Sequence, residues 1–167
     1  MEKILSRLQN KMRRLGREAE YADLRYVEIE RERIRTKNGA LDDVKESISR
    51  GVGFRVLAGG SFGFSATGDL SEKSLAGHLN RAYEMARQFS NIRHADVKLV
   101  LVKPVIARRA SAIKIDPWSL SLEEKIEPLL EAGRRLKRHS WINSALGHLD
   151  FTRKKITFVS SEGSWIE

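Results

Sequence analysis

Apolar residues recur at helical spacing in three stretches of the 167-residue chain. The first stretch predicts an amphipathic helix over residues 2–19. The second begins where Asp69 and Glu72 fit a capping box, since each carboxylate could accept a free backbone N–H, and it predicts a helix that extends to about Ser90. The two apolar stripes consist of Ile4, Leu5, Leu8, Met12 and Leu15, and of Leu75, Leu79, Ala82, Ala86 and Phe89.

The third helical stretch follows Ser121, which with Glu124 repeats the capping-box motif. Pro128 lies inside this stretch and should kink the helix, because an interior proline removes one hydrogen bond and clashes with the preceding turn. The apolar positions of this helix are Leu122, Ile126, Leu129 and Leu136.

Between the first two helical stretches, apolar and polar residues alternate as in strands. Residues 24–35 predict a strand with Val27 and Ile29 on one face and a solvent-exposed face formed by Glu28, Glu30 and Glu32. Asn38-Gly39 supplies the two positive φ angles of a type I′ turn, so residues 41–50 should return as the antiparallel partner.

The alternation continues in residues 51–57, where Val52, Phe54 and Val56 share one face and Gly51 and Gly53 lie opposite. Gly59-Gly60 predicts a second hairpin turn, which leads to Phe62 and Phe64. Counting these segments gives four antiparallel strands.

The rest of the chain predicts a strand at residues 97–102 and a long irregular connection through Pro104 and Asp116-Pro117. Two closing strands, residues 142–151 and 156–160, should be joined by a charged turn at residues 152–155. The predicted fold class is therefore α+β, with a mainly antiparallel sheet packed against two long helices, a third helix and a C-terminal hairpin.

Composition favours one domain, since 167 residues with 41% hydrophobic content can bury a core but cannot hold two full catalytic domains. No apolar run approaches the roughly 20 residues that span a bilayer, and the charged start does not resemble a signal peptide. We therefore expect no membrane association and a cytoplasmic protein. The absence of cysteine agrees with a reducing compartment and excludes thiolate metal sites in this sequence.

The formal net charge of +9 raises the question of a polyanionic partner. The basic residues are scattered over several predicted elements, however, and charged faces are usually only solvated. Binding to nucleic acid is therefore not favoured by the charge alone. The clusters are residues 11–14, 108–109, 134–138 and 153–155.

The sequence offers no catalytic, cofactor-binding or metal-binding residue. No two of the four histidines, His78, His94, His139 and His148, have the i, i+4 spacing of a helical zinc site. Ser65 and Ser111 lack a Gly-x-Ser-x-Gly setting and a recognisable base. We expect each histidine to be a surface or packing residue.

Residues 50–70, reading RGVGFRVLAGGSFGFSATGDL, resemble the signature of the TldD/PmbA family. The resemblance also includes AEYADLRY at residues 19–26, the turn after the charged strand, and SSEG at residues 160–163. KIDPWSLSLEEK at residues 114–125 is closer to the TldD branch than to the PmbA branch. The resemblance covers nearly the whole chain.

This resemblance implies that residues 1–167 form the amino-terminal domain of a protein related to zinc metallopeptidases. The His-Glu-x-x-x-His motif of that family has no counterpart here, so the resemblance implies a catalytic carboxy-terminal domain that is absent from this chain and would hold the zinc. The expected partners are that domain, a like or related subunit in a homo- or hetero-dimer, and a peptide substrate.

Two alternatives to a peptidase domain stay open. The family also carries the description of modulator of DNA gyrase, so a non-catalytic module could contact DNA or a DNA-bound partner through the basic clusters. A free-standing domain with its own role is the other alternative.

A peptide-docking surface is the one local site that the sequence suggests. Residues 51–57 could offer a backbone edge to an extended peptide, with Phe62 and Phe64 beside it. The candidate residues are Gly51, Gly53, Phe62 and Phe64. The simpler interpretation is that the glycines allow close packing and that the two rings belong to the core.

Overall fold

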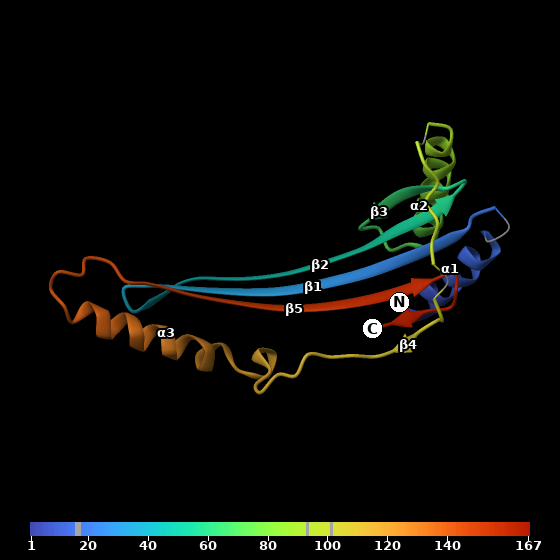
Figure 1. Cartoon of the computed structure of the whole chain (residues 1–167). Coiled ribbons are helices and arrows are strands. Elements are labelled where there is room, and N and C mark those ends of the chain that lie inside the picture. The colour runs from blue at the N-terminus through green and yellow to red at the C-terminus, as the bar shows by residue number, and fades with distance from the viewer. Residues whose placement is uncertain (16–17, 93, 101) are drawn as a thin grey trace. The chain divides into compact units, whose positions relative to one another are not determined.

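The computed structural model of the protein describes residues 1–15, 18–92, 94–100 and 102–167. Over these residues the chain forms a six-stranded, mainly antiparallel sheet in the order β3-β2-β1-β5-β6-β4, together with three α-helices (Figure 1). The predicted α+β class is confirmed. The elements are α1 (Glu2–Leu15), β1 (Tyr21–Lys37), β2 (Ala40–Ala58), β3 (Ser61–Thr67), α2 (Glu72–Ser90), β4 (Ile106–Ala107), the 3-10 helix η1 (Pro117–Ser119), α3 (Leu122–Lys137), β5 (Leu146–Ser160) and β6 (Trp165–Ile166).

The chain divides into two compact units that share the three long strands. The first unit comprises residues 1–28, 49–109 and 155–167, and the second comprises residues 29–48 and 110–154. Strands β1, β2 and β5 therefore each contribute one part to each unit.

The first unit contains the main hydrophobic core. Three positions of β2, namely Val52, Phe54 and Val56, are almost completely buried, together with residues of α1, α2, β1 and β5. Helix α2 packs against β3 (Figure 1), where a Cβ on Gly63 would come within 2.0 Å of the Ala82 carbonyl oxygen. Only glycine allows this close approach between strand and helix.

The second unit contains a buried ion pair and a stacked arginine. The Lys125 ammonium of α3 donates to the Glu32 carboxylate at 2.6 Å, and both side chains are more than nine-tenths buried. The predicted exposed position of Glu32 is therefore wrong, because a cation from α3 covers it. Nearby, the Arg153 guanidinium bonds both carboxylate oxygens of Asp116 at 2.9 Å and stacks on the Trp118 ring of η1 at 4.2 Å.

Two hairpin turns are confirmed, and two predicted strand breaks are wrong. Asn38, Gly39, Gly59 and Gly60 all have positive φ angles and separate β1, β2 and β3. Residues 41–50 and 51–57 form one strand, β2, because Gly51 and Gly53 have no positive φ that would turn the chain. The predicted four strands are therefore three.

Residues 146–160 likewise form a single strand, β5, so the predicted turn at residues 152–155 is wrong. The charged side chains of that segment are largely exposed along the strand, where they need no turn. The C-terminal hairpin is instead the antiparallel pair of β5 with β6, in which Phe158 lies opposite Ile166. No strand occupies the described part of residues 97–102, which is irregular.

The helix starts are partly confirmed. Helix α3 has the predicted capping box of Ser121 and Glu124 and continues through Pro128, whose kink stays a prediction. Helix α2 is capped by Ser71 and not by the predicted Asp69, whose carboxylate accepts from the Ser71 backbone N–H instead. The described helix α1 ends at Leu15, and residues 16–17 of the predicted helix lie outside the described residues.

The predicted apolar stripes of the three helices are buried to different extents. Those of α1 and α2 are mostly buried, although Phe89 is 47% exposed. In α3 only Ile126 is a buried apolar residue, since Leu122 and Leu136 are exposed. None of the helices in the described part of the chain is long and apolar enough to cross a membrane.

Candidate functional site

The four residues predicted to dock a peptide all lie on one face of the sheet in the first unit. Side chains alternate along a strand, so Gly51 and Gly53 lie opposite the buried Val52, Phe54 and Val56. The register of β2 and β3 places Gly53 opposite Ala66, Arg55 opposite Phe64, and Leu57 opposite Phe62. We call the surface formed by Arg25, Gly51, Gly53, Phe62 and Phe64 the glycine face.

The glycines open a hollow in this face. Its volume is about 410 Å³, and it is lined by Arg25, Val27, Gly51, Val52, Gly53, Ala66, Thr67 and Gly68. A Cβ on Gly53 would meet no atom within 4 Å, whereas one on Gly51 would lie 3.3 Å from the Thr67 carbonyl oxygen. The predicted close packing of a helix or another strand against Gly53 is therefore wrong, and the space beside it is open.

Aromatic rings lie beside the hollow. The ring centroids of Phe62 and Phe64 are 6.0 Å apart, and Phe64 is 56% exposed. The interpretation of Phe64 as a core residue is therefore wrong, while Phe62 is half-buried. The Arg55 guanidinium lies 5.1 Å from the Phe62 ring centroid and covers part of it.

Arg55 forms a short ion pair with Asp23. Its guanidinium donates to the Asp23 carboxylate at 2.6 and 2.8 Å. Burial of Arg55 opposes its charged form, but the hydrogen bonds and charge of Asp23 outweigh burial and raise the pKa of Arg55. Burial, followed by the charge of Asp23, raises the pKa of the Tyr21 phenol to about 12. Both groups therefore keep their usual protonation states at neutral pH.

The backbone edge that the sequence suggested is not available on β2. Residues Val52–Ala58 pair with β3, and β2 lies between β3 and β1. Strand β3 is the outermost strand instead, and the Phe64 backbone N–H donates to the Met85 thioether of α2 at 3.4 Å. At Phe64, therefore, this outer edge has no free N–H with which a peptide strand could pair.

The structure also brings together a serine and a histidine that the sequence did not connect. The Ser65 hydroxyl lies 2.7 Å from Nδ1 of His78, so β3 and α2 are joined by a hydrogen bond. The expectation that Ser65 lacks a nearby base is wrong in this respect. Neither residue lines the hollow of the glycine face, and we assign the pair a structural role.

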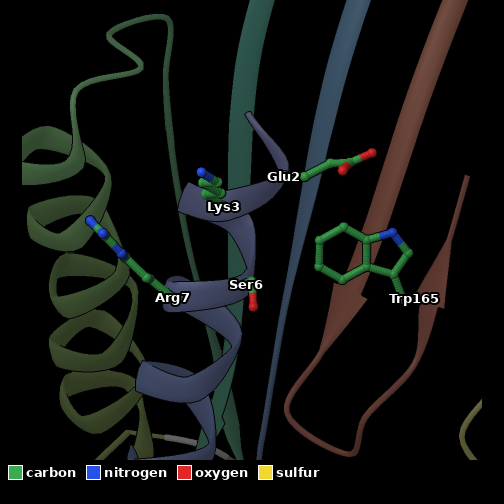
Figure 2. Close-up of a pocket in the computed structure, with 5 residues that line it drawn as sticks. All are labelled: Glu2, Lys3, Ser6, Arg7 and Trp165. Atoms are coloured by element: carbon green, nitrogen blue, oxygen red, sulfur yellow. The ribbon is translucent and has the colours of Figure 1, made fainter.

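A second hollow, of about 580 Å³, lies beside the first two turns of α1 (Figure 2). Trp165 faces these turns, while Arg7 points towards α2, where it donates to Glu72 at 2.8 Å. Glu2, Lys3 and Ser6 complete the lining. The lining contains both carboxylate and cationic groups, so it favours neither anionic nor cationic ligands.

The described residues do not fit a zinc site. No three side chains of histidine, cysteine, aspartate or glutamate come close enough together in that part of the chain to hold a metal ion. The zinc chemistry implied by the family resemblance is therefore not assigned to any residue described here.

Comparison with known proteins decides the family. A family model described as PmbA/TldA metallopeptidase domain 1 matches residues 22–86, which include the glycine face. The chain belongs to the PmbA/TldD family. A metalloprotease of Methanocaldococcus jannaschii is 28% identical over 157 residues, which cover 94% of this chain and 35% of that protein. A metalloprotease of Methanothermobacter thermautotrophicus is 28% identical over 148 residues, 89% of this chain and 31% of that protein.

Two solved structures share the fold. A proposed modulator of a DNA gyrase from Thermotoga maritima matches 98% of this chain and 36% of its own, with a TM-score of 0.71 and 17% identity. TldE from Thermococcus kodakarensis matches 95% of this chain and 35% of its own, with a TM-score of 0.67 and 11% identity. The chain thus spans about a third of the length of the relatives it matches.

Two residues that line the hollow of the glycine face were missed in the sequence. Arg25 and Ala66 have no special pattern of their own, and they reach this face because their strands, β1 and β3, lie on either side of β2. The alternation after Gly53 could have placed Arg55 on the same face. Placing Arg25 beside Gly51 and Gly53 required the continuity of β2 past residue 50, which the sequence did not indicate.

Proposed function

We propose that this chain is the substrate-side domain of a PmbA/TldD-family metallopeptidase, and that the glycine face receives an extended segment of the substrate peptide. One observation carries the proposal: Gly51, Gly53, Phe62 and Phe64 share a sheet face, and Gly53 leaves open space on it. Backbone without side chains lets a ligand approach closely, and the exposed Phe64 ring offers an apolar contact.

The catalytic step itself belongs to residues outside those described. The curated relatives are named metalloproteases, and each is about three times as long as its match to this chain. In this proposal a further domain supplies the zinc and its bound water, while this domain binds and orients the peptide. The proposal also includes a dimer with a like or related subunit and, because the sequence lacks cysteine, a cytoplasmic location.

The alternative of a DNA-binding module receives less support from the basic clusters. Arg134 and Arg135 pair with Glu127 and Glu131 on their own helix. Arg153 is held by Asp116. These cations already have carboxylate partners, so fewer of them remain for phosphates than the sequence suggested.

The test fills the hollow without disturbing the fold. In Gly53→Val the new side chain enters open space, and valine suits a strand, so the thermal stability should be unchanged. We expect this variant to bind a labelled, extended peptide of alternating valine and threonine about tenfold more weakly than the wild type, which corresponds to roughly 1.4 kcal/mol. Fluorescence anisotropy of the labelled peptide measures the affinity.

The matched control is Gly77→Ala, because Gly77 lies on α2 and also has open space around it. This variant should bind like the wild type. If Gly53→Val folds normally and binds the peptide with wild-type affinity, the glycine face is not the docking surface.

A further inference from the structure

Arg25 gives the hollow of the glycine face a single charge. Among the described residues that line it, the others are glycines, Val27, Val52, Ala66 and Thr67, so no carboxylate offsets the guanidinium. The other arginines of this region differ in this respect, since Arg55 is paired with Asp23 and Arg50 with Glu28. Arg25 forms no ion pair with any described residue.

The position of Arg25 is nevertheless defined. Its guanidinium lies 5.9 Å from the centroid of the Phe158 ring on β5, within the range of a cation–π contact. The side chain is exposed, so its N–H groups are accessible to a ligand in the hollow. A guanidinium held by an aromatic ring loses little freedom when it binds an anion.

We infer that this hollow binds a carboxylate of the substrate peptide, which rests on the function proposed above. A guanidinium and a carboxylate form paired, charge-assisted hydrogen bonds, and the hollow of about 410 Å³ has room for a short acidic group. The carboxylate comes either from the C-terminus of the peptide or from an aspartate or glutamate side chain.

The neighbouring Phe64 adds a second requirement. Ala66 lines the hollow, and Phe64 precedes it by two residues on the same face, about 7 Å along β3. Arg25 lies on β1, two strand spacings of about 4.8 Å across the sheet from β3, so a peptide whose carboxylate contacts Arg25 would place an apolar side chain about three or four residues away on the Phe64 ring. The preferred substrate class is a peptide in which an acidic group lies close to an apolar side chain.

The experiment compares peptides that differ only in charge. Anisotropy measurements on this chain would use a valine-threonine peptide with an amidated C-terminus, the same peptide with a free C-terminal carboxylate, and an amidated version with one internal aspartate. The wild type should prefer at least one acidic peptide over the neutral one by about tenfold. Arg25→Gln should abolish this preference, which is the ratio of the affinities for the acidic and neutral peptides measured on the same variant.

Arg81→Gln is the control, because Arg81 is an exposed residue of α2 and its loss changes the net charge equally. A preference for the free C-terminus or for aspartate identifies which carboxylate is bound, and either supports the inference. Equal binding of all three peptides to the wild type overturns it, as does a preference that persists in Arg25→Gln. Equal binding leaves the docking function intact, whereas no binding of any peptide overturns both.

Discussion

At the residue scale, the clearest departure from the sequence pattern is Glu32. Alternation along β1 indicated an exposed carboxylate, yet Glu32 is 5% exposed and bonds the Lys125 ammonium. The Phe151 ring lies 5.6 Å from the same ammonium and contributes a cation–π contact. A lysine one turn inside a distant helix cannot be matched to a strand glutamate from periodicity, because the pairing depends on how α3 packs.

The stability of the second unit should depend on keeping both members of the Glu32–Lys125 pair. Lys125→Met leaves the Glu32 carboxylate buried without its cation, and we expect a loss of roughly 3–5 kcal/mol in the free energy of unfolding. The double variant Lys125→Met/Glu32→Leu removes both charges and should be near the wild type or more stable. Urea denaturation followed by circular dichroism measures both values.

An exposed pair provides the control. Arg135→Met removes a cation that bonds Glu131 at the surface of α3, and it should change the stability by less than about 0.5 kcal/mol. Equal effects of Lys125→Met and Arg135→Met would show that the Glu32–Lys125 pair is not buried in solution.

At the scale of elements, the contact of α2 with β3 depends on Gly63. A Cβ at this position would lie 2.0 Å from the Ala82 carbonyl oxygen and 2.5 Å from the Ala86 backbone nitrogen, so the helix must shift. We expect Gly63→Ala to lower the free energy of unfolding by about 1–3 kcal/mol, the usual cost of overpacking. The midpoint of urea denaturation measures the change.

Gly53→Ala is the matched substitution on the opposite face of the same strand pair. It meets open space and has no positive φ, so the stability should rise slightly or stay the same. A Gly63→Ala variant as stable as Gly53→Ala would contradict the observed packing of α2 on β3.

The elements also show what the sequence could and could not predict. Turns at Asn38-Gly39 and Gly59-Gly60 were predictable because positive φ angles require such residues. The continuity of β2 through Gly51 was not predictable, because glycine can adopt both turn and strand conformations. For the site, four residues of one face were predictable from alternation along the strands, but the open space at Gly53 and the presence of Arg25 depend on tertiary packing.

At the scale of the whole molecule, the two units differ in how much apolar surface they bury. Among the described residues of the second unit, the buried apolar side chains are only Ile34, Ile126 and Ala145. The first unit holds the large core cluster of α1, α2 and the sheet. Hydrophobic burial is the dominant stabilising contribution to folding, so the second unit should have the lower local stability.

Hydrogen exchange along β1 tests this difference within one strand. Residues 21–28 belong to the first unit and residues 29–37 to the second. We expect the amides of residues 29–37 to exchange at least tenfold faster than those of residues 21–28, because local opening of the second unit exposes fewer apolar groups. Mass spectrometry of peptides from both halves measures the rates.

Helix α3 offers an independent measurement, since its amides should exchange at rates close to those of residues 29–37 if the second unit opens as a whole. Equal protection along all of β1 would instead show that the long strands couple both units into one cooperative structure. In that case Lys125→Met would destabilise the glycine face as well, and peptide binding would weaken in a variant that leaves the face itself unchanged.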